Sequence, residues 1–210
     1  MKTILSQALA LPSIFLLSLF LASSAPMEQG YKIGDFAENF ELKNIDGNLV
    51  SPGMIKYSAA KGFIIVFTCN HCPFSKKYED RIMALNKKYE GLGYPLMAIN
   101  PNDAEREPED SYENMQKLAK EKGYDFPYLH DESQQTSYRF GAEKTPHVFI
   151  LKKESGKLKV VYSGAIDDDV QNIKERKQKY VENALDELLA GKAVSNPTTK
   201  AVGCGIKWKQ

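Results

Sequence analysis

The stretch FIIVFTCNHCP, residues 63–73, decides the fold. Its first five residues are a continuous apolar run of β-favouring side chains, which predicts a strand buried on both faces of a sheet. Cys69 and Cys72 follow at once, and Pro73 comes directly after them. Because proline is tolerated in the first turn of a helix but not in its interior, Pro73 places a helix start near the second cysteine. We therefore expect Cys69 at the mouth of a helix and Cys72 in its first turn.

This position predicts thiol chemistry. A helix N-terminus has unpaired N–H groups and a positive dipole end, both of which stabilise a thiolate, the nucleophilic form of cysteine. We expect Cys69, as the more exposed of the two, to attack a disulfide and Cys72 to resolve the mixed disulfide. An imidazole at His71 would stabilise the thiolate further and make the pair more oxidising.

The rest of the chain predicts an α/β protein with a central mixed sheet flanked by helices and extended by an N-terminal β-hairpin. The Asp46-Gly47 turn marks the hairpin. Helical spacing and turn residues predict helices over 74–89, 112–119, about 135–140 and 170–189, with strands at 95–99, 147–151 and 157–162. Asp110 and Ser111 are both candidate caps for the second helix.

The N-terminus has the pattern of a signal peptide over residues 1–25, in which Lys2 precedes an apolar run and a small-residue end. An uncleaved membrane anchor is the alternative, and either implies an exported protein facing a periplasmic or other extracytoplasmic compartment. We expect a domain over 31–192 and a C-terminal tail over 193–210.

Charge excludes one class of partner. The chain carries a formal charge of +1, and removing residues 1–25 takes away Lys2 alone and leaves a neutral domain. The densest basic run, residues 174–179, falls in the last predicted helix and indicates a solvated helix face. We therefore expect no nucleic-acid partner, and a membrane partner only if the N-terminal segment stays uncleaved.

Cys69 and Cys72 have two alternative interpretations besides exchange chemistry, a zinc site and a purely structural disulfide. Zinc needs four ligands, and the chain offers no second ligand pair to complete a site. A purely structural disulfide across so short a loop would stabilise little. We expect no cofactor.

Several phrases resemble the peroxiredoxin-like (redoxin, AhpC-TSA-like) branch of the thioredoxin-like superfamily: FTCNHCPF at 67–74, FGAEKTPHVFIL at 140–151 and VGCGIKWK at 202–209. The resemblance implies a thioredoxin-like fold. It also implies that Pro146 is a cis-proline facing the cysteines, and that Thr145 presents backbone groups to a substrate peptide.

The chain departs from a standard peroxiredoxin before its cysteines. Val66 and Gly62 stand where that family carries a threonine and a proline before its peroxide-reactive cysteine. Counted from Cys72 instead, the same positions hold Cys69 and Ile65. Arg139 is the only arginine near the later strands that could activate a peroxide.

The functional prediction is a thiol-disulfide oxidoreductase that exchanges disulfides with proteins and with a reducing or oxidising partner protein. The alternatives are an antioxidant thiol peroxidase and a copper carrier with Cys69, Cys72 and His147 as ligands. In the absence of an acid on the strand over 63–67, His71 or His147 is the candidate for proton handling. Cys204, between two glycines in the tail, is either a further redox cysteine or an unreactive one.

Overall fold

The structure is a computed structural model that describes residues 30–175 and 177–210. The segment predicted to be a signal peptide or anchor lies outside these residues. Within the two described ranges, no helix has the length and apolar character that crossing a membrane requires.

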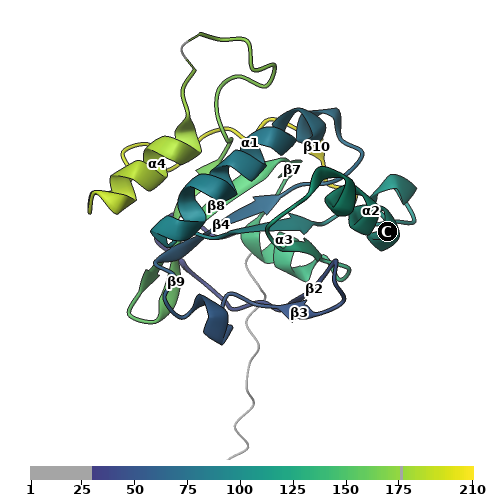
Figure 1. Cartoon of the computed structure of the whole chain (residues 1–210), viewed down its shortest axis with the longest axis horizontal. Coiled ribbons are helices and arrows are strands. Elements are labelled where there is room, and N and C mark those ends of the chain that lie inside the picture. The colour runs from purple at the N-terminus through teal and green to yellow at the C-terminus, as the bar shows by residue number, and fades with distance from the viewer. Residues whose placement is uncertain (1–29, 176) are drawn as a thin grey trace, which may run out of the picture.

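The centre of the molecule is an eight-stranded sheet in the order β1-β9-β8-β4-β5-β6-β2-β3 (Figure 1). β4 is parallel to β5, and β5 to β6, whereas the other neighbours are antiparallel. The predicted mixed sheet is therefore confirmed. The strand bounds are β1 Phe36–Ala37, β2 Leu42–Asn44, β3 Leu49–Val50, β4 Gly62–Phe67, β5 Leu96–Asn100, β6 Tyr128–His130, β8 His147–Glu154 and β9 Lys157–Gly164.

Helices cover both faces of this sheet (Figure 1). One buried cluster joins α1, α2 and α4 to one face, and a second joins α3, the N-terminal strands and the C-terminal tail to the other. The helix bounds are α1 Pro73–Tyr89, α2 Tyr112–Lys122, α3 Gln135–Phe140 and α4 Tyr180–Leu189, with the 3-10 turns η1 Ile55–Tyr57, η2 Glu90–Leu92 and η3 Pro108–Asp110.

β4 lies in the middle of the sheet and leads straight into the cysteines. Its side chains alternate between the two clusters, with Ile64 and Val66 on one face and Phe63, Ile65 and Phe67 on the other. All are buried, which confirms the predicted strand covered on both faces. The hairpin at Asp46-Gly47 is also confirmed, because β2 and β3 pair antiparallel across it.

The prediction of a last helix from residue 170 is wrong, because α4 begins only at Tyr180. The preceding loop instead satisfies its backbone through aspartates. Asp167 accepts from the backbone N–H of Asp169, and Asp169 accepts from that of Lys174. Such local side-chain bonds offer the backbone an alternative to a helix. The described part of the basic run over 174–179 therefore lies in a loop.

A second, two-stranded sheet fastens the C-terminal tail to the domain. β7 (Lys144–Thr145) pairs antiparallel with β10 (Cys204–Gly205), and Cys204 lies opposite Thr145. The Thr145-Pro146 peptide bond directly after β7 is cis, as the resemblance implies. The tail is thus docked beside the loop that faces the cysteines.

Candidate active site

The two cysteines of the motif lie between β4 and α1. Cys72 is the N-cap of α1, and its carbonyl accepts from the backbone N–H of Lys76. Pro73 is the first helical residue, so the helix start is confirmed at the predicted proline. Cys72 was predicted in the first turn of the helix, but it lies one position before the first helical residue. Cys69 precedes the helix altogether.

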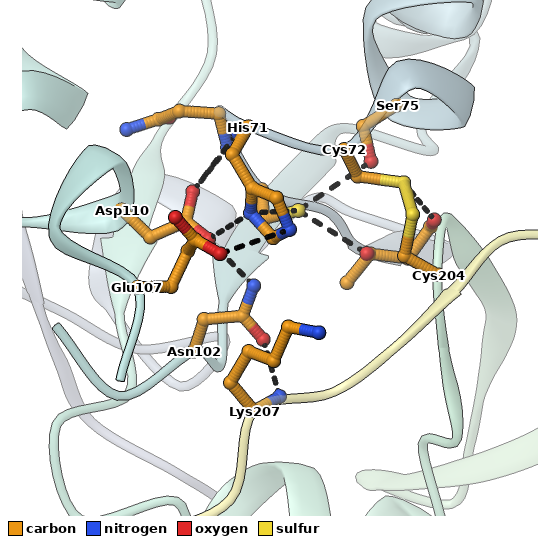
Figure 2. The surroundings of a disulfide bond; sticks show 11 residues. His71, Cys72, Ser75, Asn102, Glu107, Asp110, Cys204 and Lys207 are labelled. Carbon is orange, nitrogen blue, oxygen red and sulfur yellow. Dashed lines mark hydrogen bonds and ion pairs between the residues drawn. A yellow bond between two sulfur atoms is a disulfide. The ribbon is translucent and has the colours of Figure 1, made fainter. Parts of the chain in front are cut away.

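Cys72 is bonded to Cys204, across 132 residues of chain, and Cys69 is left as a free cysteine (Figure 2). The sequence predicts exchange between Cys69 and Cys72 and leaves the role of Cys204 open. The structure brings all three cysteines to one place and joins the second to the third.

Noncovalent contacts hold the tail at the residues that follow Cys204. Ile206 is buried in the second cluster, which joins α3 and the N-terminal strands to one face of the sheet. The backbone N–H of Lys207 donates to Asn102 Oδ1 at 2.9 Å, and Gln134 Nε2 donates to the Lys207 carbonyl at 2.8 Å. The tail therefore does not depend on the disulfide alone for its position.

Gly203 explains how closely the tail approaches the cis-proline loop. A Cβ atom at this position would lie 2.2 Å from the Thr145 carbonyl oxygen, closer than any real contact. Only a residue without a side chain fits there without a shift of the backbone. At Gly205, one residue beyond Cys204, a Cβ atom would meet open space.

Thr145 contacts both cysteines of the motif. Its Oγ1 lies 3.2 Å from Cys69 Sγ, and its carbonyl oxygen lies 3.2 Å from Cys72 Sγ. The second contact becomes a hydrogen bond only when Cys72 is a thiol, since a disulfide sulfur has no proton to donate. The family resemblance implies a role for the Thr145 backbone groups, and the side-chain contact with Cys69 is an addition to it.

Cys69 is 3% exposed and Cys72 is 0% exposed, so Cys69 is the more exposed of the two, as expected, but both are buried. Burial, followed by the negative charge of Asp110, raises the pKa of its thiol to about 11. Hydrogen bonds from Thr145, the Cys72 backbone and Ser75 oppose this shift without cancelling it. The expected lowering of the pKa is therefore wrong for this state, because desolvation outweighs the donors near the helix start.

Asp110 organises the surroundings of the motif. Its buried carboxylate accepts from the backbone N–H groups of Asn70 (2.6 Å) and His71 (3.2 Å) on Oδ1, and from Asn102 Nδ2 (2.6 Å) on Oδ2. From the sequence, Asp110 is predicted only as a candidate helix cap. Ser111 makes that cap instead, accepting from the Asn114 N–H. No local pattern signals the role of Asp110 at the motif, because Asn70 and His71 lie 40 and 39 residues earlier in the chain.

His71 lies between two carboxylates (Figure 2). Its Nδ1 is 2.6 Å from Asp110 Oδ2, and its Nε2 is 3.5 Å from Glu107 Oε2. The distance from Nδ1 to Cys69 Sγ is longer, 3.7 Å. The ring is thus next to the thiol, as predicted, but its closest partner is a carboxylate that the sequence did not reveal.

His147, the other candidate for proton handling and a candidate metal ligand, is placed differently. Its Nε2 is 3.1 Å from Ser163 Oγ, and its Nδ1 accepts from the backbone N–H of Glu143. Burial lowers its pKa to about 4, so the ring is neutral at physiological pH. The potential metal ligands that cluster in the described ranges are Cys69, His71 and Asp110, whose ligand atoms lie within 4.8 Å of one another.

Comparisons with known proteins place the chain in a family. The model of the AhpC/TSA family matches residues 33–161. A conserved protein of Geobacillus kaustophilus, described as uncharacterized, is 40% identical, with a TM-score of 0.76 over 85% of this chain and 93% of that one. A hypothetical protein of Sinorhizobium meliloti is 31% identical, with a TM-score of 0.77 over 86% and 96%.

A more distant structure indicates the fold. A putative thiol:disulfide interchange protein DsbE of Chlorobium tepidum is 20% identical, with a TM-score of 0.50 over 63% of this chain and 84% of that one. Among curated proteins there is no match. The fold is thioredoxin-like, and the chain belongs to the AhpC/TSA family.

Proposed function

We propose that this protein is a thiol-disulfide oxidoreductase that acts on disulfides of other proteins through Cys69 and Cys72. The observation that carries this proposal is the shared contact with Thr145. A free thiol and a disulfide-bonded sulfur, three positions apart in the chain, touch the hydroxyl and the carbonyl oxygen of one residue. That arrangement supports sulfur exchange with little movement of the backbone.

In the proposed reaction, Cys69 attacks a substrate disulfide once its thiol has lost the proton. The Thr145 and Ser75 hydroxyls and the Cys72 N–H stabilise the thiolate, since each lowers the Cys69 pKa against the effect of burial. The substrate's second sulfur leaves as a thiol. Cys72, after its bond to Cys204 has been reduced, attacks Cys69 and releases the substrate in reduced form.

The test is a trap that retains a single thiol. In the Cys72→Ala/Cys204→Ser variant, Cys69 is the only cysteine, so a mixed disulfide cannot be resolved from within the chain. Incubation with insulin, whose disulfides are accessible, should give a covalent adduct that maps to Cys69 and disappears on reduction. Cys69→Ser in the same background is the matched control. A trap that captures no insulin disulfide contradicts the proposal.

Membership of the AhpC/TSA family favours one second candidate, a thiol peroxidase with an antioxidant role. The site offers limited support for it, because Arg139 is engaged 2.9 Å from Glu38 and burial raises the Cys69 pKa. Rapid oxidation of the single-thiol variant by hydrogen peroxide, together with an empty insulin trap, would establish the peroxidase instead.

A metal carrier has less support than either enzyme. Asp110, one member of the potential ligand cluster, already accepts three hydrogen bonds on its two oxygens and faces the His71 ring. These contacts orient the carboxylate toward the motif loop and occupy the lone pairs that a metal would need. We therefore assign the cluster to support of the thiol.

We propose further that the protein works in an extracytoplasmic compartment. Two observations support this location: the signal-like segment over residues 1–25, and a disulfide that joins positions far apart in the chain. Disulfides form and persist mainly in oxidising compartments. Fractionation of cells that express the full chain tests the location.

A further inference from the structure

The three cysteines are unequally accessible to an external thiol. Cys72 is fully buried and Cys69 is 3% exposed. Cys204 is partly exposed, and the next residue, Gly205, is exposed and lacks a side chain. A thiol carried by another protein therefore reaches the Cys72–Cys204 bond from the side of the tail.

We propose that Cys204 is the entry point for electrons, the sulfur at which the dithiol of a reducing partner protein exchanges with the site, an inference that rests on the proposed exchange function. A partner thiolate attacks Cys204 Sγ, a new sulfur–sulfur bond forms there, and the bond to Cys72 breaks. The electron pair leaves on Cys72, which takes up a proton. The partner's second thiol then displaces Cys204, so that the partner is oxidised and Cys72 and Cys204 are both thiols.

The surroundings of Cys72 suit it as the leaving sulfur. It caps the N-terminus of α1, a helix of 17 residues, whose dipole favours developing negative charge on Cys72, whereas complete burial opposes that charge as it does at Cys69. A sulfur that is more stable as an anion leaves faster in disulfide exchange. Once protonated, Cys72 Sγ has the Thr145 carbonyl oxygen within 3.2 Å as a ready acceptor. Cys204 has neither advantage, because it lies in a two-residue strand of the tail.

The docking of the tail allows the cycle to repeat. Ile206, and the bonds of Lys207 to Asn102 and Gln134, hold the chain just beyond Cys204 through contacts that do not include the disulfide. After Cys72 has resolved the substrate from Cys69, Cys204 is still close enough to attack the Cys69–Cys72 disulfide. That step restores the Cys72–Cys204 bond and frees Cys69, with no net oxidation. Electrons then pass from the partner through Cys204 and Cys72 to Cys69.

The first experiment identifies the attacked sulfur with glutathione as the probe. The full chain with Cys69→Ser contains only the disulfide pair, so no third thiol can move the label. The oxidised variant is treated with a small amount of glutathione, quenched with acid, and digested without reduction. We expect adducts on Cys204 over Cys72 by about tenfold or more, because Cys204 is partly exposed and Cys72 is fully buried. Equal labelling, or a preference for Cys72, overturns the inference.

Two additions sharpen this result. The same variant unfolded in denaturant loses both the burial and the helix, so its adducts should fall on both cysteines. A thioredoxin whose second active-site cysteine has been replaced by serine serves as the protein probe, and its stalled mixed disulfide should map to Cys204. Absence of that adduct, with the glutathione reaction intact, would show that a protein thiol does not reach Cys204 and would overturn the inference.

The outcome is separable from that of the insulin trap, which lacks Cys204. A working trap with glutathione on Cys72 removes the electron entry point and leaves the proposed function standing. Glutathione on Cys204 together with an empty insulin trap keeps Cys204 as the attacked sulfur and contradicts the proposed exchange with substrate proteins.

Discussion

Among single residues, Cys69 determines the pH at which the site can act as a nucleophile. Its pKa of about 11 leaves little thiolate at neutral pH, and the thiolate fraction rises about tenfold per pH unit until the pKa is reached. We therefore predict that the alkylation rate of Cys69 keeps rising well above pH 9. The measurement uses the Cys72→Ser/Cys204→Ser variant, in which alkaline thiol exchange cannot occur, with carbon NMR of labelled cysteine as a second readout. A plateau below pH 8 would contradict the prediction.

Asp110 provides a second prediction for the same thiol. Its charge is the second-largest cause of the raised Cys69 pKa, after burial. In the single-thiol background, Asp110→Asn should therefore lower the pKa of Cys69, and the alkylation profile should shift to lower pH. Glu109→Gln is the matched control, since this neighbouring carboxylate is exposed and pairs only loosely with Lys76 at 3.8 Å. Equal shifts in the two variants would remove the specific role of Asp110.

The proximity of these residues could be predicted from the sequence, but the state of Cys69 and the partner of Cys72 could not. Cys69, Cys72 and His71 follow one another in a loop whose position is fixed by a strand and a proline, so their proximity is predictable. The state of Cys69 is not, because its pKa depends on burial by the completed fold and on Asp110. The partner of Cys72 was equally hidden, since 132 residues separate it from Cys204.

At the scale of elements, the pairing of β7 with β10 depends on Gly203. Gly203→Ala places a methyl group against the Thr145 carbonyl, and overpacking of this kind costs about 1–3 kcal/mol. The tail must then move away from β7 and carry Cys204 with it. We predict that the Cys72–Cys204 bond becomes easier to reduce, with its equilibrium in a glutathione buffer shifted toward the thiols by about tenfold.

Gly205→Ala is the control for this substitution, because the added methyl group meets open space on the other side of Cys204. It adds the same atoms and removes the same backbone freedom. If both alanine variants shift the equilibrium equally, then chain stiffness rather than the approach to Thr145 is responsible.

A helix or strand could be predicted from the sequence where the interactions that form it are local. α1 and α2 were predictable because helical periodicity and Pro73 are local signals, and α2 extends to Lys122, with Gly123 as its C-cap. α4 was predicted too long, because Asp167 and Asp169 hold the preceding backbone in a loop. β10 has only two residues and exists through its partner strand, so no local pattern could indicate it.

For the molecule as a whole, the disulfide ties the end of the chain to the start of α1. It closes a loop of 132 residues, and a loop of that size gives an entropic stabilisation of about 4–5 kcal/mol in the simplest model, with about 2–4 kcal/mol typical of measurements. We predict that Cys204→Ser lowers the free energy of unfolding by about 2–4 kcal/mol, measured by urea denaturation of the full chain under oxidising conditions. Cys69→Ser, which keeps the disulfide, should lose much less.

The same experiment under reducing conditions separates the covalent link from the side chain that was changed. Reduced wild-type protein has no cross-link, so it should unfold at nearly the urea concentration that unfolds Cys204→Ser. The tail should remain docked in both, because Ile206 and the Lys207 bonds do not involve the disulfide. Amide exchange at Lys207, whose N–H is bound to Asn102, reports that docking directly. If reduction leaves the unfolding midpoint of the wild type unchanged, the bond contributes exchange chemistry to this molecule and no stability.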